Sequence, residues 1–403
     1  MSLYNKASLI QVPSLYKDGL LVSTIPEDRS GDFTVARGSN LAATRVGEDG
    51  YIKKGYENLL LQSNTFSDAA WTWYSTSVTG GQTDRDGGSD AYLIIRSSGG
   101  GLIGRQQISL SGVYTFSIYV KINALNGIAL SLGGTSQIAH FNISNENQTT
   151  AGFSTGLIDS TQEYVGNNFY KLSITANTTT TQVRLYLSNA AGTLIDSGGG
   201  SHIIQDAQLN QGLVAYPYLE TTTDPVQGGL LENTPRLDWS NGVPAVLIEE
   251  GRTNRCIFSE YFQGAAWLSI GSPTITNNYG ISPEGLKNST RIVFSGSNEC
   301  IYDGIAYTSE EVSTIYVKGT SGETIKFGKG DNIFVGNIFT LDGTWQRLEF
   351  VQSVSGNTFT INTSSGVTAR EIEIWGAQNE EGSTPSSYIP TYGTSQTRSS
   401  ETI

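Results

Sequence analysis

The stretch Tyr114-Thr-Phe-Ser-Ile-Tyr-Val-Lys121 decides the fold, because apolar and polar side chains alternate along it with a period of two. A second stretch, Tyr170-Lys-Leu-Ser-Ile-Thr-Ala176, has the same alternation. This period is typical of strands in a sheet that buries one face. We therefore predict that both stretches are strands at the centre of a sheet.

Working outward from Ile118-Tyr-Val-Lys121, the chain repeats itself, because Ile315-Tyr-Val-Lys318 follows 197 positions later. Three further pairs of blocks flank this one in a single order: Ala69-Ala-Trp71 with Ala265-Ala-Trp267, Phe169-Tyr-Lys-Leu172 with Trp345-Gln-Arg-Leu348, and Tyr218-Leu-Glu-Thr221 with Tyr388-Ile-Pro-Thr391. The offset falls from 196 to 170 positions, so the first copy carries 26 residues more in its loops. Blocks in one order predict two homologous domains rather than a short-period solenoid.

The composition indicates the kind of domain that is repeated. The 403 residues include 47 Gly, and only 15% are charged, which disfavours a helix-rich chain. Short strands separated by turns rich in Gly and Asn are typical of an antiparallel sandwich. We predict an all-β chain with two tandem β-sandwiches of the jelly-roll type. An immunoglobulin-like sandwich is the less favoured alternative, since the first copy has no cysteine.

Five segments follow from these patterns. Residues 1–55 contain turn signals between short apolar pieces, so we expect them to dock against another surface rather than bury a core of their own. Residues 56–221 and 254–391 are the predicted sandwiches. Residues 222–253 are rich in Pro and Gly and are expected to form an ordered connector, and residues 392–403 a polar tail.

Charge and hydropathy weigh against several classes of partner. The chain has 37 acidic and 24 basic residues, a net charge of −13, which disfavours binding to nucleic acid or to an anionic membrane. No run of 18 apolar residues is present, and residues 1–14 do not resemble a secretory signal, so we expect no membrane insertion. Cys256 and Cys300 allow one bridge, but two buried free thiols are favoured.

Few residues are arranged for catalysis. The chain has two histidines, and His202 aligns with Ile372 of the second copy, which indicates a packing position. No zinc-protease, nucleophile-elbow or phosphate-loop motif occurs. We therefore expect no enzyme activity and no cofactor. Calcium is the one alternative, because Asp84, Asp86 and Asp90 lie among glycines and could offer oxygen ligands.

Aromatic residues that the two copies do not share are the candidates for ligand binding. Trp71 and Trp267 are shared, so we assign both to the common core. Trp73, Tyr74 and Tyr92 have no aromatic counterpart in the second copy, and aromatic rings can pack against the faces of sugars. These three are our candidate carbohydrate-binding residues. The alternative is that Trp73 only packs on a neighbouring loop or subunit.

Several short phrases resemble those of bacteriophage appendage proteins, namely tail-fibre, tail-spike and head-fibre proteins, including those of crAss-like phages. The phrases are Gly31-Asp-Phe-Thr34, Ala43-Thr-Arg-Val46, Tyr56-Glu-Asn-Leu59, Glu250-Gly-Arg-Thr-Asn254, Trp375-Gly-Ala-Gln378 and Ser386-Ser-Tyr-Ile-Pro-Thr391. The repeated domain is similar to the jelly rolls of carbohydrate-binding modules. This resemblance implies a virion structural protein with outward domains, in which residues 1–55 contact other virion proteins.

We accordingly expect a non-enzymatic component of a phage particle, made in the host cytoplasm and exposed on the virion, where it contacts glycans. A homo-oligomer, a trimer by the fibre resemblance, is expected from the first 55 residues and from an exposed face with Tyr119, Tyr316 and Trp375. Two alternatives stay open: a purely architectural collar or adaptor protein, and a tail spike that degrades polysaccharide, which would need two converging carboxylates.

Overall fold

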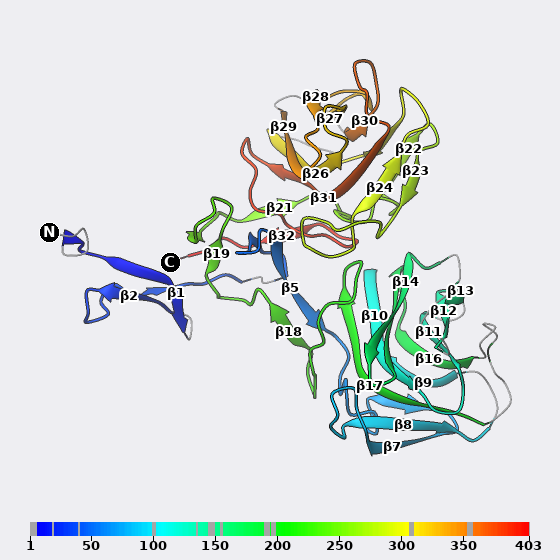
Figure 1. Cartoon of the computed structure of the whole chain (residues 1–403). Coiled ribbons are helices and arrows are strands. Elements are labelled where there is room, and N and C mark those ends of the chain that lie inside the picture. Colours follow the sequence, from blue (N-terminus) through cyan, green and yellow to red (C-terminus); the bar gives the residue numbers. More distant parts are fainter. Residues whose placement is uncertain are drawn as a thin grey trace. The chain divides into compact units, whose positions relative to one another are not determined.

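A computed structural model describes residues 6–17, 20–38, 41–98, 102–133, 136–143, 150–153, 156–188, 194, 199–305, 310–352 and 358–402. Its regular elements are all β-strands, and every pairing given between them is antiparallel, which confirms the predicted fold class (Figure 1). The chain divides into two compact units. The first unit is Tyr56–Gln227, and the second combines Met1–Gly55 with Gly228–Ile403.

The first unit is a sandwich of two six-stranded sheets. One sheet has the order β14-β15-β10-β17-β8-β7, with β7 (Thr76–Gln82), β8 (Ala91–Arg96), β10 (Gly112–Ile122), β14 (Asp159–Gly166), β15 (Phe169–Thr178) and β17 (Gly200–Gln211). The other has the order β13-β12-β11-β16-β9-β6, with β6 (Trp71–Trp73), β9 (Leu102–Gln107), β11 (Gly127–Leu132), β12 (Ile138–Asn142), β13 (Thr150–Phe153) and β16 (Gln182–Ser188). Both predicted central strands are present, as β10 and β15.

The second unit contains a sandwich of two five-stranded sheets. One sheet has the order β23-β24-β31-β26-β29, with β23 (Thr274–Thr276), β24 (Thr290–Val293), β26 (Glu311–Gly319), β29 (Gln346–Gln352) and β31 (Glu371–Glu381). The other has the order β22-β25-β30-β27-β28, with β22 (Trp267–Ile270), β25 (Cys300–Asp303), β27 (Thr324–Gly330), β28 (Asn337–Thr340) and β30 (Thr358–Asn362).

The two sandwiches have the same wiring, which is that of a jelly roll. In the first, β8-β17-β10-β15 forms one four-stranded layer and β9-β16-β11-β12 the other; in the second, β24-β31-β26-β29 and β25-β30-β27-β28 take the same places in chain order. Eight strands in two such layers are the jelly-roll arrangement. Strands β13 and β14 occur only in the first unit, between β12 and β15, where the offset between the repeats falls.

The strand faces predicted to be exposed are covered, which corrects one expectation. Tyr119 is only 8% exposed and Trp375 is fully buried, while Tyr316 is half-buried. The Arg85 guanidinium lies 4.5 Å from the ring centroid of Tyr119, and Trp375 packs against Tyr388 and Ile52. Alternation along a strand shows that its two faces differ, but it cannot show that a distant loop covers the polar face.

Four small sheets use the remaining strands. They are β1 (Ile10–Lys17), β2 (Leu20–Ile25) and β3 (Phe33–Thr34); β4 (Thr44–Val46), β5 (Ile52–Asn58) and β18 (Val226–Gly229); β19 (Arg236–Asp238) and β20 (Ala245–Leu247); and β21 (Arg252–Asn254) with β32 (Gln396–Arg398). The residues predicted as a connector and a polar tail thus contain strands, and Arg398 in β32 is fully buried. No helix in the described part of the chain is long and apolar enough to cross a membrane.

Candidate functional site

The predicted carbohydrate-binding residue Trp73 lies at the end of β6 and is half-buried. Its indole Nε1 donates a hydrogen bond to the carbonyl oxygen of Phe66 at 2.7 Å. Its ring stacks on Trp71 with centroids 6.1 Å apart and meets Phe66 edge-on at 6.5 Å. The indole N–H is therefore bonded within the domain, and the ring packs against the hydrophobic core of the first unit.

The structure brings Tyr92 close to Trp73 but places Tyr74 elsewhere. The Tyr92 ring meets the edge of Phe66 at 5.6 Å, so Trp73 and Tyr92 converge on one core side chain. Tyr74 instead lies beside Arg105, whose guanidinium is 5.4 Å from its ring centroid. All three candidates are half-buried, and sugar contact through them stays a prediction.

The tryptophans shared by the two copies are core residues, as predicted. Trp71 donates from Nε1 to the carbonyl oxygen of Gln62 at 3.1 Å, and Trp267 donates to that of Phe258 at 2.8 Å. Gln62 and Phe258 occupy equivalent positions of the repeat, so the contact is duplicated with the sequence. Both indoles are buried.

The repeated blocks also contain a polar lock that the sequence analysis missed. Asn58 donates from Nδ2 to the carbonyl oxygens of Ala207 and Leu219 and accepts the N–H groups of Leu60 and Leu209 at Oδ1. Asn254 makes the same four bonds in the second unit, to Ala377, Ile389, Cys256 and Asn379. Both asparagines are fully buried. Each one ties the strand that enters its jelly roll to the last long strand and the segment after it.

A serine, a tyrosine and a threonine complete each lock. Ser63 Oγ lies 2.8 Å from the Tyr218 hydroxyl, and Ser259 Oγ lies 2.7 Å from that of Tyr388. The equivalent threonines, Thr221 and Thr391, donate to the carbonyl oxygens of Leu60 and Cys256 at 2.5 and 2.6 Å. The duplicated residues are therefore structural, and their matched spacing in both copies was the signal that could have revealed the lock.

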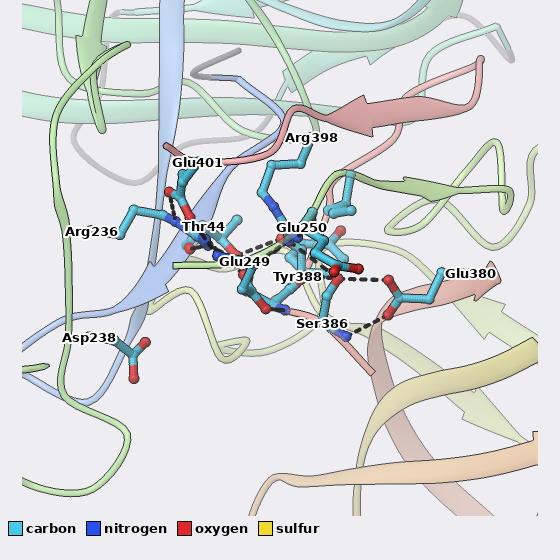
Figure 2. A network of polar contacts seen from close by, with 12 residues as sticks. Thr44, Arg236, Asp238, Glu249, Glu250, Glu380, Ser386, Tyr388, Arg398 and Glu401 are labelled. Carbon is cyan, nitrogen blue, oxygen red and sulfur yellow. Dashed lines mark hydrogen bonds and ion pairs between the residues drawn. The ribbon is translucent and has the colours of Figure 1, made fainter. Parts of the chain in front are cut away.

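A buried ionic network lies in the second unit (Figure 2). Arg236 donates from Nε to Glu401 at 2.5 Å and from Nη2 to Glu249 at 2.8 Å. Arg37 also pairs with Glu401, at 3.1 Å, and Arg398 with Glu249, at 3.1 Å. The three guanidiniums are fully buried. Because Glu401 is shared by Arg37 and Arg236, and Glu249 by Arg236 and Arg398, the network links three segments that are far apart in the sequence.

The network continues into the loop that follows β31. Arg398 donates to the hydroxyls of Ser386 and Ser387, and Glu380 accepts from the backbone and hydroxyl of Ser386, both at 2.7 Å. Burial alone would raise the pKa of Glu249, but Arg398, Ser387 and Arg236 together hold it below its ordinary value. Three arginines and three carboxylates balance in charge, as a buried network requires.

Two further buried clusters of ionisable side chains lie in the second unit. Lys54 pairs with Glu260 at 2.9 Å and with Glu284 at 3.0 Å, and burial raises the pKa of Glu260. Burial also raises the pKa of Asp303 to about 7, against the opposing charge of Lys329. The Oδ2 atom of Asp303 has no hydrogen-bond partner among the described residues.

Asp84 and His202, which the sequence offered for metal binding and catalysis, form hydrogen bonds within the first unit. Asp84 accepts the backbone N–H groups of Asp86, Gly88 and Asp90, which shapes its own loop. No group of three His, Cys, Asp or Glu side chains among the described residues is placed to hold a metal ion. His202 is fully buried, its Nε2 is 3.0 Å from the carbonyl oxygen of Gly127, and burial lowers its pKa to about 4.

The cysteines are both buried and free, which agrees with the favoured interpretation of the sequence. Burial raises the pKa of the Cys256 and Cys300 thiols, so neither thiolate is stabilised.

Comparison with known proteins adds little to this geometry. No family model matches the chain, and no curated protein matches it. One solved structure, the crystal structure of a GH78 family rhamnosidase of Bacillus sp. GL1, aligns with 91% of the chain at 8% identity and a TM-score of 0.10. The chain spans 35% of the rhamnosidase, and a score this low carries no argument about fold or function.

Proposed function

We propose that this protein is a non-enzymatic structural component of a phage particle, a head or tail fibre that projects from the virion and contacts glycans. The observation that carries this proposal is the duplicated jelly roll with its duplicated lock. Asn58 and Asn254 tie the entering strand of each sandwich to its last long strand from inside the domain. Rigid scaffolds with variable loops are suited to display and contact.

The first strands support the idea of an attachment segment. Strands β1, β2 and β3 form a small sheet of their own, and the ladder pairs given for them join them only to one another. Leu9 is 44% exposed, and Leu20 and Phe33 are each 36% exposed. Apolar side chains on such a small sheet favour contact with another protein, here a second virion component.

The charges of the second unit support a structural role rather than catalysis. In the ionic network of Figure 2, each carboxylate pairs with an arginine or accepts hydrogen bonds from a serine of the same chain. Glycoside hydrolysis instead needs two carboxylates that converge on a substrate. Several copies of the chain on one particle would turn weak glycan contacts into useful avidity.

Cryo-electron microscopy of the phage particle tests this proposal. We expect density for the chain on the virion surface, with residues 10–34 against a capsid or tail protein and the loops of at least one jelly roll facing solvent. Absence of the chain from purified particles would contradict the virion assignment. Density with both jelly rolls enclosed by other proteins would support an architectural adaptor and end the glycan part of the proposal.

A further inference from the structure

A cavity of about 320 Å³ lies within the second unit, next to the ionic network. Its walls come from β4 and the first residue of β5, from residues 238–249, and from β26, β29 and residues 385–388 of the jelly roll. Pockets for small molecules have volumes of about 300–1,000 Å³, so this cavity is suited to one ring-sized unit.

Two arginines line this cavity, and most of their donors are not used by the protein. Arg45 donates from Nη1 to the carbonyl oxygen of Leu237 at 2.6 Å, and Arg347 from Nη2 to Thr314 Oγ1 at 3.0 Å. The Nε of Arg347 is buried and has no hydrogen-bond partner within the described part of the chain. Neither guanidinium forms an ion pair with a carboxylate of a described residue.

The carboxylates in the lining are already engaged. Glu249 is neutralised by Arg236 and Arg398. Asp238 accepts the backbone N–H groups of Val46 and Ser240 at 2.8 and 3.0 Å. With Glu249 neutralised, two arginines face one aspartate, so the lining has one positive charge in excess although the chain carries −13. Both guanidiniums are half-buried, and an anionic ligand would give their unused donors a charged partner.

The remaining walls are those that a sugar ring needs. Tyr316 presents aromatic surface, Ile52 adds apolar surface, and Ser240 adds a hydroxyl. The Arg347 guanidinium lies 5.6 Å from the centroid of the Tyr316 ring, which keeps its planar fork beside the aromatic face. A guanidinium fork matches the two oxygens of a carboxylate, which a point charge does not.

We propose that this cavity binds a carboxylate-bearing sugar unit, a hexuronate, with Arg45 and Arg347 on the carboxylate and Tyr316 against the ring. The inference rests on the glycan contact of the proposed function and names its ligand class. It moves the contact from Trp73, Tyr74 and Tyr92 of the first unit to a cavity of the second.

Calorimetric titration of the full chain tests the inference with four probes: D-glucuronate, its methyl ester, D-glucose and acetate. We expect D-glucuronate to bind at least tenfold more tightly than each of the others, because only it combines the carboxylate with the ring. Arg347→Gln and Arg45→Gln should each weaken D-glucuronate binding at least tenfold. Arg291→Gln is the matched control, because Arg291 pairs with Glu371 on the surface of the same unit and does not line the cavity.

Several results would overturn the inference. They are equal binding of D-glucose, binding of acetate as tight as that of D-glucuronate, absence of D-glucuronate binding by the folded chain, and unchanged binding in a folded Arg347→Gln variant. If Arg45→Gln fails to fold, Arg347→Gln decides alone. None of these results depends on where the chain lies on the particle, so failure here is distinguishable from failure of the virion assignment.

Discussion

Asn58 and Asn254 show how much one repeated residue can contribute, since each is fully buried and makes four hydrogen bonds. Replacing Asn58 by alanine leaves two carbonyl oxygens and two N–H groups of the backbone without partners. We expect Asn58→Ala to lower the free energy of unfolding of the first unit by about 2–4 kcal/mol. Chemical denaturation followed by tryptophan fluorescence measures this loss.

Asn123→Ala is the control for that experiment, because Asn123 is exposed and its side chain donates a single hydrogen bond among the described residues, to the hydroxyl of Ser201. It should change stability by less than about 0.5 kcal/mol. Asn254→Ala should reproduce the large loss in the second unit. A loss as small for Asn58→Ala as for Asn123→Ala would show that the lock does not hold the sandwich together.

Asp303 gives a pH-dependent prediction. Its pKa is raised to about 7 by burial, so the folded chain binds this proton more tightly than the unfolded chain does. The stability cost of ionising it is therefore absent below pH 4, grows between pH 4 and pH 7, and is complete above pH 7. We expect Asp303→Asn to raise the free energy of unfolding at pH 8 by about 2 kcal/mol and to have little effect at pH 4.

Urea unfolding of wild-type protein and Asp303→Asn at both pH values measures this difference. Asp331→Asn, at an exposed position of the same unit, serves as the control and should shift neither curve. If the free energies of unfolding of wild-type protein and Asp303→Asn differ by the same amount at pH 4 and at pH 8, the pH dependence does not come from Asp303.

At the residue scale, the comparison of the two copies predicts which residues pack in the core. Trp71 and Trp267 occur at equivalent positions of the two copies, which predicted that both are core residues. His202 aligns with Ile372 of the second copy, which predicted that it is a packing residue. All three are buried. Tyr119 and Trp375 were expected to be exposed, and this expectation was wrong. The rings are covered by Arg85 in one unit and by Ile52 and Tyr388 in the other, residues that lie far from them in sequence.

At the scale of elements, β32 is the strand with the clearest role. It places Arg398 in the buried network, and Glu401 follows three residues later. Glu401→Gln leaves the buried guanidiniums of Arg37 and Arg236 with one partner charge fewer. We expect this change to lower the free energy of unfolding of the second unit by about 3–5 kcal/mol, because an unpaired buried charge is strongly destabilising.

Thermal unfolding of Glu401→Gln beside Glu310→Gln checks this prediction, since Glu310 is exposed. The control should keep the wild-type melting temperature, whereas Glu401→Gln should lower it by several degrees. An unchanged melting temperature for Glu401→Gln would mean that Glu249, Ser387 and backbone carbonyls satisfy the two arginines without the charge of Glu401.

The elements themselves were partly predictable. Alternation located β10, β15 and β26, because a half-buried strand must repeat every two residues. It could not locate β19, β20 or β32, which are three residues long and too short to show a period. Their pairing depends on tertiary contacts through Arg236, Glu249 and Arg398, so spacing in the sequence contains no sign of it.

At the scale of the whole molecule, self-association is the next prediction. With Tyr119 and Trp375 buried, the sequence features that still favour an oligomer are three exposed apolar side chains, Leu9 just before β1, Leu20 of β2 and Phe33 of β3. We expect light scattering at micromolar concentration to give the mass of a homo-oligomer, a trimer by the fibre resemblance. A chain without residues 1–35 keeps Arg37 and should give the mass of a monomer. A monomeric mass for the full chain would contradict the prediction.

The ionic network has a consequence for how the chain is made. The first unit is one continuous segment, so a ribosome can release it for folding while later residues are still being synthesised. The second unit needs both Arg37 and Glu401, which are separated by the whole of the first unit. Residue 37 must therefore wait for its partner until residue 401 has been synthesised. A premature stop codon or a nick before Glu401 would leave a folded first unit beside an unfinished second one.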